Sequence, residues 1–138
     1  EVFLRRSESP GDARRRFIVG RLLPAHRHLI PQAVEYGLGM RNVPYDQLYL
    51  TDPEALYCSE LVVDMFRSAN GKKEFFVERP MSFRDLNTGE VLPAWIEYYE
   101  RFGMKVPDGE PGSNPGDISS DVRLEIVVAE GPPSGYVA

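Results

Sequence analysis

The segment Leu56–Phe66 holds the only cysteine of the chain, and it constrains the fold more than any other stretch. Starting from Cys58, apolar residues recur at helical spacing, at Leu61, Val62, Met65, Phe66 and Ala69. Asp52-Pro53 is a turn signal upstream, and Gly71 is a stop signal downstream. The pattern predicts a helix of about twelve residues that begins at Cys58 and turns one face toward a core.

A thiol in the first turn of a helix is suited to chemistry. Unpaired N–H groups and the positive end of the helix dipole favour thiolate over thiol, and they can donate to a developing oxyanion. Glu60 opposes this effect unless its carboxylate turns outward or is paired, so activation of Cys58 still needs a nearby base. The alternative is that Cys58 is a small core residue on the apolar face.

Two motifs around Cys58 carry a family resemblance. Tyr57-Cys58-Ser59-Glu60-Leu61-Val62, with Pro44-Tyr45-Asp46 upstream, resembles the nucleophile segment of NlpC-type papain-like cysteine hydrolases. Tyr57 and Glu60 stand where the commonest members have Asp and Gly. This variant is similar to the YiiX/YebB-like group, whose fold is a circular permutation of papain. The segments 95–107 and 114–119 are similar to the tail of that group, so the resemblance extends from about Arg15 to Val128.

The resemblance implies an α+β, permuted papain-like fold in which a central nucleophile helix packs on a small antiparallel sheet. It implies a cysteine hydrolase, a peptidase or amidase, that cleaves an amide or ester bond through a Cys58 thioester. Tyr45 is then expected beside Cys58 as a second catalytic residue, and Tyr57 and Glu60 are expected to bind substrate. The alternative is a catalytically silent binding or interaction module derived from that fold.

The same resemblance suggests a small peptide or acyl-amide substrate, derived from the cell wall or from lipid, and a bacterial envelope or periplasmic location. No cofactor is expected. No residue of the sequence selects among these substrates, and the oligomeric state is left open.

Composition limits the remaining possibilities. A chain of 138 residues with 42% hydrophobic and 27% charged residues indicates one globular domain, 1–138, with a frayed tail at 130–138. No apolar run is long enough to span a bilayer. The net charge of −5 gives no reason to expect a nucleic-acid partner. A single cysteine excludes an internal disulfide.

The order of residues along the chain restricts the catalytic base. Papain-like catalysis needs a histidine to take the thiol proton, and no histidine follows Cys58. The two candidates, His26 and His28, do not match the His-x-Gly-Ile-Val pattern of the permuted family, so we expect neither to be the base. They also lack a third ligand at a matching spacing, so no metal site is expected. We expect the base in an N-terminal portion that this chain lacks.

Other segments give weaker expectations. Strands are expected at 16–23, 72–78 and 122–129, and the first and last of these are expected in one small antiparallel sheet. Helices are expected from Pro31 to Gly39 and from Pro93 to Gly103, the second with a core stripe of aromatic residues. The segments 42–54 and 106–116 are expected to be loops.

Overall fold

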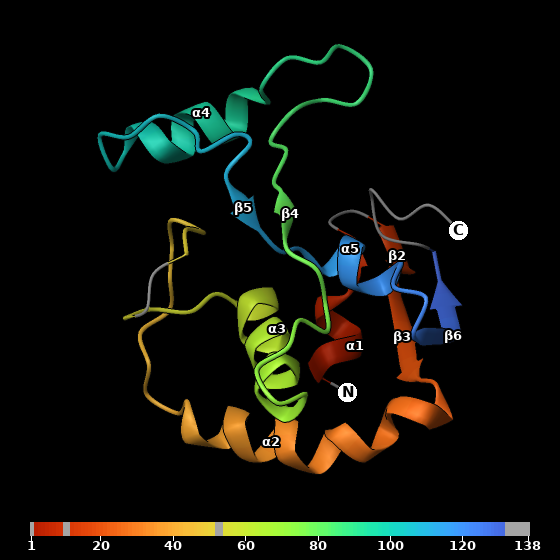
Figure 1. Cartoon of the computed structure of the whole chain (residues 1–138). Coiled ribbons are helices and arrows are strands. Elements are labelled where there is room, and N and C mark those ends of the chain that lie inside the picture. The colour runs from red at the N-terminus through yellow and green to blue at the C-terminus, as the bar shows by residue number, and fades with distance from the viewer. Residues whose placement is uncertain (1, 10–11, 52–53, 132–138) are drawn as a thin grey trace.

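The computed structural model describes residues 2–9, 12–51 and 54–131. Its centre is helix α3 (Cys58–Ala69), which lies over helix α2 (Ile30–Gly39) and beside the antiparallel pair β3 (Phe17–Leu22) and β6 (Leu124–Glu130) (Figure 1). In this pair Phe17 lies opposite Glu130 and Leu22 opposite Leu124. The predicted twelve-residue helix beginning at Cys58 and the predicted sheet are both confirmed.

The remaining elements are short. They are helix α1 (Val2–Arg6), strands β1 (Glu8–Ser9) and β2 (Asp12–Arg15), the 3₁₀ helix η1 (Pro24–Leu29), strand β4 (Arg79–Pro80), helix α4 (Pro93–Glu100), strand β5 (Pro111–Gly112) and helix α5 (Pro115–Ser119). β1 pairs with β2 and β4 pairs with β5, both antiparallel. The predicted turn at 52–53, and residues 132–138 of the predicted tail, lie outside the described residues.

One hydrophobic core joins α2, α3 and the sheet. Val63 of α3 is completely buried there, and the other buried members are Leu22, Leu29, Ala33, Ala69, Phe75 and Phe76. Gly37 allows the two helices to approach, because a Cβ at this position would lie 2.9 Å from the Met65 sulfur. None of the described helices is long and apolar enough to cross a membrane.

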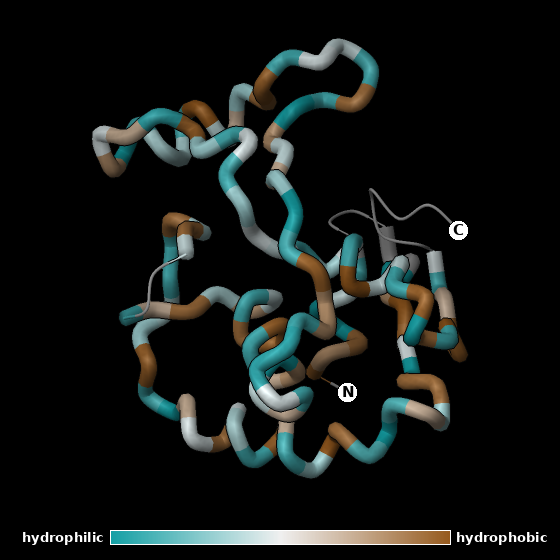
Figure 2. The backbone as a smooth tube through the Cα atoms, in the orientation of Figure 1, coloured by the Kyte–Doolittle hydropathy of each residue, from teal (hydrophilic) through white to brown (hydrophobic). Residues whose placement is uncertain are grey.

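A second cluster surrounds the aromatic residues of α4. Tyr99 is completely buried against Met81 and Phe83, and Trp95 and Tyr98 pack around them. This part projects from the main body on β4 and β5 (Figure 1), and Figure 2 shows hydrophobic residues both in it and around α3. The predicted aromatic core stripe is therefore present, but it forms a separate cluster, and Phe102 at its end is exposed.

The predicted strand at 72–78 is wrong. Phe75 and Phe76 are both buried in the main core, whereas consecutive side chains of a strand point to opposite faces. Phe75 stacks on Phe66 with 5.2 Å between ring centroids, and the Arg123 guanidinium lies 4.4 Å from the centroid of the Phe75 ring. Phe75 and Phe76 are therefore held by side-chain packing and not by pairing with another strand.

Other boundaries also differ from the predictions. The segment 106–116 is not a loop throughout, because it contains β5 and the start of α5. β6 begins at Leu124 and not at 122, since the Asp121 carboxylate accepts a hydrogen bond from the backbone N–H of Arg123 and makes a turn. Val122 is 88% exposed as a result. Helix α4 ends at Glu100, and Gly103 follows with φ of 67°.

Candidate active site

Cys58 is the first residue of α3, and it is exposed. The preceding residue, Tyr57, has an extended backbone with φ of −96° and ψ of 168°, so the chain turns into the helix at the thiol. The alternative in which Cys58 is a core residue is therefore wrong. Of the predicted apolar stripe, Ala69 is buried in the core and Val62, Met65 and Phe66 pack against that core. Ser59, Glu60 and Val63 of the helix are buried as well.

The loop that carries Tyr45 is attached to the chain just before Cys58. The backbone N–H of Asp46 donates to the Leu56 carbonyl at 3.2 Å, and the N–H of Leu56 donates to the Pro44 carbonyl at 3.0 Å. Partial desolvation raises the pKa of the Tyr45 hydroxyl to about 12, and its interactions with Cys58 and Tyr49 add to the increase. The two backbone hydrogen bonds thus bring the Tyr45 loop to the residues just before Cys58, and near neutral pH the Tyr45 hydroxyl is in its protonated, donating form.

Asp46 fixes the conformation of this loop. Its buried carboxylate accepts hydrogen bonds from the N–H groups of Leu48, at 2.7 Å, and Leu50, at 2.6 Å. Tyr49 between them has a φ of 55°, in the left-handed region that non-glycine residues rarely adopt. The sequence reasoning did not single out Asp46, although an Asp that follows Pro-Tyr and precedes a loop is a recognisable signal for this kind of turn.

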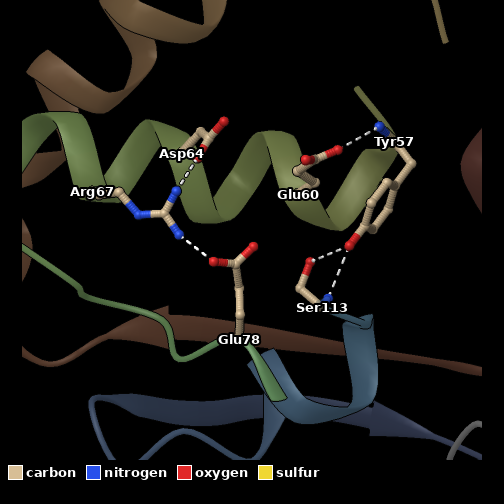
Figure 3. A network of polar contacts seen from close by, with 6 residues as sticks. All are labelled: Tyr57, Glu60, Asp64, Arg67, Glu78 and Ser113. Atoms are coloured by element: carbon tan, nitrogen blue, oxygen red, sulfur yellow. Dashed lines mark hydrogen bonds and ion pairs between the residues drawn. The ribbon is translucent and has the colours of Figure 1, made fainter. Parts of the chain in front are cut away.

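Tyr57 and Glu60, on either side of the exposed Cys58, are both buried. Tyr57 is 3% exposed and Glu60 is 5% exposed. The Glu60 carboxylate accepts a hydrogen bond from the Tyr57 N–H at 3.3 Å, which ties the helix start as a capping box does (Figure 3). Glu60 is therefore turned inward and paired. The expected substrate-binding role of these two residues stays a prediction.

Burial also changes the protonation of Glu60. Desolvation raises the pKa of this carboxyl group to about 7. The hydrogen bond from the Tyr57 N–H acts in the opposite direction, and the nearby carboxylates of Asp64, Asp46 and Glu78 raise the pKa further. Below about pH 7 the neutral form of Glu60 predominates, so its opposition to a thiolate at Cys58 is reduced.

Ser113 joins the residues on both sides of Cys58. The Tyr57 hydroxyl accepts a hydrogen bond from the Ser113 N–H at 2.9 Å, and the Ser59 hydroxyl donates to the Ser113 carbonyl at 2.9 Å. Figure 3 shows the Tyr57 side chain extending from the start of α3 to Ser113. The sequence reasoning missed both serines, because the pairing joins positions more than fifty residues apart.

Two hollows meet at the start of α3, and Cys58, Ser59 and Pro115 line both of them. The larger has a volume of about 620 Å³ and lies against β3, β6 and α5, where Ile18, Leu22, Val62, Phe66, Ile118 and Leu124 give it an apolar wall. The smaller has a volume of about 300 Å³ and is lined by Tyr49, Tyr57, Phe83 and Trp95 together with Ser82, Ser113 and Asn114. Both are in the size range of small-molecule sites.

The chain's two histidines, His26 and His28, line neither hollow. The His26 ring packs edge-on against Phe75, with 5.4 Å between centroids, and His28 is exposed on η1. That neither histidine is the base stays a prediction. Over the described ranges, no group of three or more His, Cys, Asp or Glu side chains is arranged to hold a metal ion.

Comparison with known proteins gives two further findings. The family model described as "Permuted papain-like amidase enzyme, YaeF/YiiX, C92 family" matches residues 2–128. A solved structure titled as the metalloprotein yiiX from Escherichia coli O157:H7 is similar, with a TM-score of 0.62 and 21% sequence identity. The match covers 85% of this chain and 63% of that chain, so the present chain spans less than two thirds of the yiiX structure. No curated protein sequence matches.

The family match extends over nearly the whole chain, and the structural match covers 85% of it. The expected α+β, permuted papain-like fold is confirmed. The chain belongs to the permuted papain-like amidase family of YaeF and YiiX.

Proposed function

We propose that the protein is a cysteine hydrolase in which Cys58 attacks the carbonyl carbon of an amide or ester. The observation that carries the proposal is the exposed position of Cys58 at the first residue of α3, beside the Tyr45 hydroxyl and between two hollows. Because the family is described as an amidase family, we propose an amide as the bond that is cleaved. A peptide or an acyl-amide is the substrate class that we propose.

The steps follow from the residues at the site. A base takes the Cys58 proton, and the sulfur forms a bond to the carbonyl carbon while the oxygen becomes an oxyanion. The N–H groups at the start of α3 and the Tyr45 hydroxyl stabilise that oxyanion. Collapse of the intermediate breaks the bond to the amine or alcohol, which leaves with a proton. Water then hydrolyses the Cys58 thioester, and the acid and free thiol are released.

We propose that the base comes from outside these 138 residues and enters through the larger hollow. Neither histidine of the chain lines a hollow at Cys58. Tyr45 itself lines neither hollow, but it interacts with Tyr49, which lines the smaller one, and we therefore assign the oxyanion donor to that side. The larger hollow then remains for an imidazole and for part of the substrate.

The yiiX structure is titled a metalloprotein, but the described donors of this chain do not form a site for a metal. The proposed steps therefore use none. The second candidate is a binding module without chemistry, and the absence of an imidazole from the two hollows at Cys58 favours it.

A single-turnover ester assay tests the proposal. A longer protein that includes an upstream histidine segment is mixed with p-nitrophenyl acetate, and release of p-nitrophenol is followed together with the mass of the protein. We expect a burst of p-nitrophenol and an acetyl group on Cys58, both lost in Cys58→Ala. A burst that survives in Cys58→Ala contradicts the proposal, and the lack of any burst in the longer wild-type protein supports the binding module.

A further inference from the structure

The peptide of Ser113 contacts the residues immediately before and after Cys58. Tyr57 accepts a hydrogen bond from the Ser113 N–H, and Ser59 donates one to the Ser113 carbonyl, each at 2.9 Å. All three residues are buried, with at most 4% exposed. Two buried hydrogen bonds to the backbone of one residue, Ser113, therefore hold the first turn of α3 from both sides of the thiol. Figure 3 shows the bond that Tyr57 accepts.

Ser113 is itself held on both sides. Before it, Gly112 pairs with Arg79 across β4 and β5, and a Cβ on Gly112 would lie 2.5 Å from the Met81 sulfur. After it, the Asn114 side chain accepts a hydrogen bond from the Asp117 N–H at 2.9 Å and caps α5. Because its neighbours are fixed by strand pairing and by a helix cap, the Ser113 peptide is a rigid anchor.

Such an anchor matters because helix ends fray. A nucleophile at the first position of a helix loses its orientation when the first turn opens, and a displacement of about 1 Å in a reacting group can reduce a rate on the order of a hundredfold. Tyr57 and Ser59 oppose this opening, because their hydrogen bonds join the first turn of α3 to Ser113, which lies more than fifty residues further along the chain.

We propose that Tyr57 and Ser59 are positioning residues for Cys58, which they orient through the Ser113 peptide. The catalytic meaning of this inference rests on the proposed function. The Ser113 hydroxyl also donates to the Tyr57 hydroxyl, but at 3.4 Å this hydrogen bond is longer than the two backbone bonds at 2.9 Å. We therefore assign the anchoring to the backbone of Ser113.

This distinction gives three informative variants. Tyr57→Phe removes the acceptor of the Ser113 N–H, and Ser59→Ala removes the donor to the Ser113 carbonyl. Ser113→Ala keeps both of these bonds. Two control variants remove hydroxyls elsewhere: Tyr36→Phe, on α2, and Ser120→Ala, whose hydroxyl donates to Gly116.

The first measurement is the rate of alkylation of Cys58 by iodoacetamide in the folded 138-residue chain, across a pH series. The second is the ester assay above on the longer protein. We expect Tyr57→Phe and Ser59→Ala to change the pH profile of alkylation and to lower the acylation rate at saturating ester about tenfold or more, with KM little changed. Ser113→Ala and both controls are expected to match the wild type.

Three results overturn the inference. One is that Tyr57→Phe and Ser59→Ala lower the melting temperature while their alkylation profiles stay like those of the controls, which is a structural role only. Another is a decrease of the acylation rate in Ser113→Ala that is as large as the decrease in Tyr57→Phe. The third is that Cys58→Ala is inactive in the ester assay while Tyr57→Phe and Ser59→Ala acylate as fast as the wild type. If Cys58→Ala is active in the ester assay, the proposed function is contradicted. In that case the alkylation profiles of Tyr57→Phe and Ser59→Ala test the positioning role without the ester assay.

Discussion

The backbone beside Tyr45 is hydrogen-bonded to Leu56, two residues before Cys58, although Tyr45 and Cys58 are thirteen positions apart in the sequence. The short parallel bridge between Tyr45 and Leu56 brings the Tyr45 loop to this position. A hydroxyl that stays protonated and a thiol at a helix start are the two groups that an acyl-transfer site needs for oxyanion support and for attack.

Tyr45→Phe is expected to reduce acylation of the longer protein by p-nitrophenyl acetate by about a hundredfold, the usual loss for one oxyanion donor. Stability should change by less than about 0.5 kcal/mol, because Tyr45 is 55% exposed. Stopped-flow release of p-nitrophenol and thermal unfolding measure the two effects. If the burst rate of Tyr45→Phe equals that of the wild type, Tyr45 has only a packing role.

Cys58 should react with iodoacetamide in the folded chain without denaturant, because the residue is exposed. Mass spectrometry of the native protein gives the extent of labelling, and Cys58→Ser is the control that must stay unlabelled. Labelling that begins only in denaturant would mean that the thiol is inaccessible, and both the site and its chemistry would then be wrong.

Glu60 should make stability depend on pH. Its pKa in the folded state, about 7, lies above the reference value of 4.5, so the unfolding free energy should fall as the pH rises from about 4.5 to about 7. The loss amounts to at most about 3 kcal/mol. Glu60→Gln should remove this dependence and be more stable than the wild type at pH 8, because glutamine remains neutral when buried.

Urea unfolding at several pH values measures the effect of Glu60. The matched control is Glu100→Gln, since Glu100 is exposed on α4. This control should keep the slope of the wild type between pH 4.5 and pH 7. A Glu60→Gln variant with the same slope would show that other groups cause the dependence.

His26→Ala and His28→Ala should leave the activity of the longer protein nearly intact, whereas the 138-residue chain alone should hydrolyse ester very slowly. His26→Ala should cost on the order of 1 kcal/mol of stability, because it removes the edge-on contact with Phe75. Paired activity and unfolding measurements separate the two effects. A large loss of activity in either variant places the base within this chain.

Local patterns in the sequence were sufficient for the helix beginning at Cys58, for the strands that became β3 and β6, and for the motif that pointed to the family. These features depend on side-chain period, turn residues and motif spacing, which are properties of neighbouring residues. The order of Cys58 and the histidines along the chain also restricts the catalytic arrangement.

Tertiary structure decided the rest. It turned Glu60 into the interior, exposed Cys58, and buried Phe75 and Phe76 together where a strand was expected. It also brought Ser113 to Tyr57 and Ser59. These outcomes depend on contacts between segments far apart in the chain, and the side-chain period of a helix or strand carries no information about which distant peptide meets it.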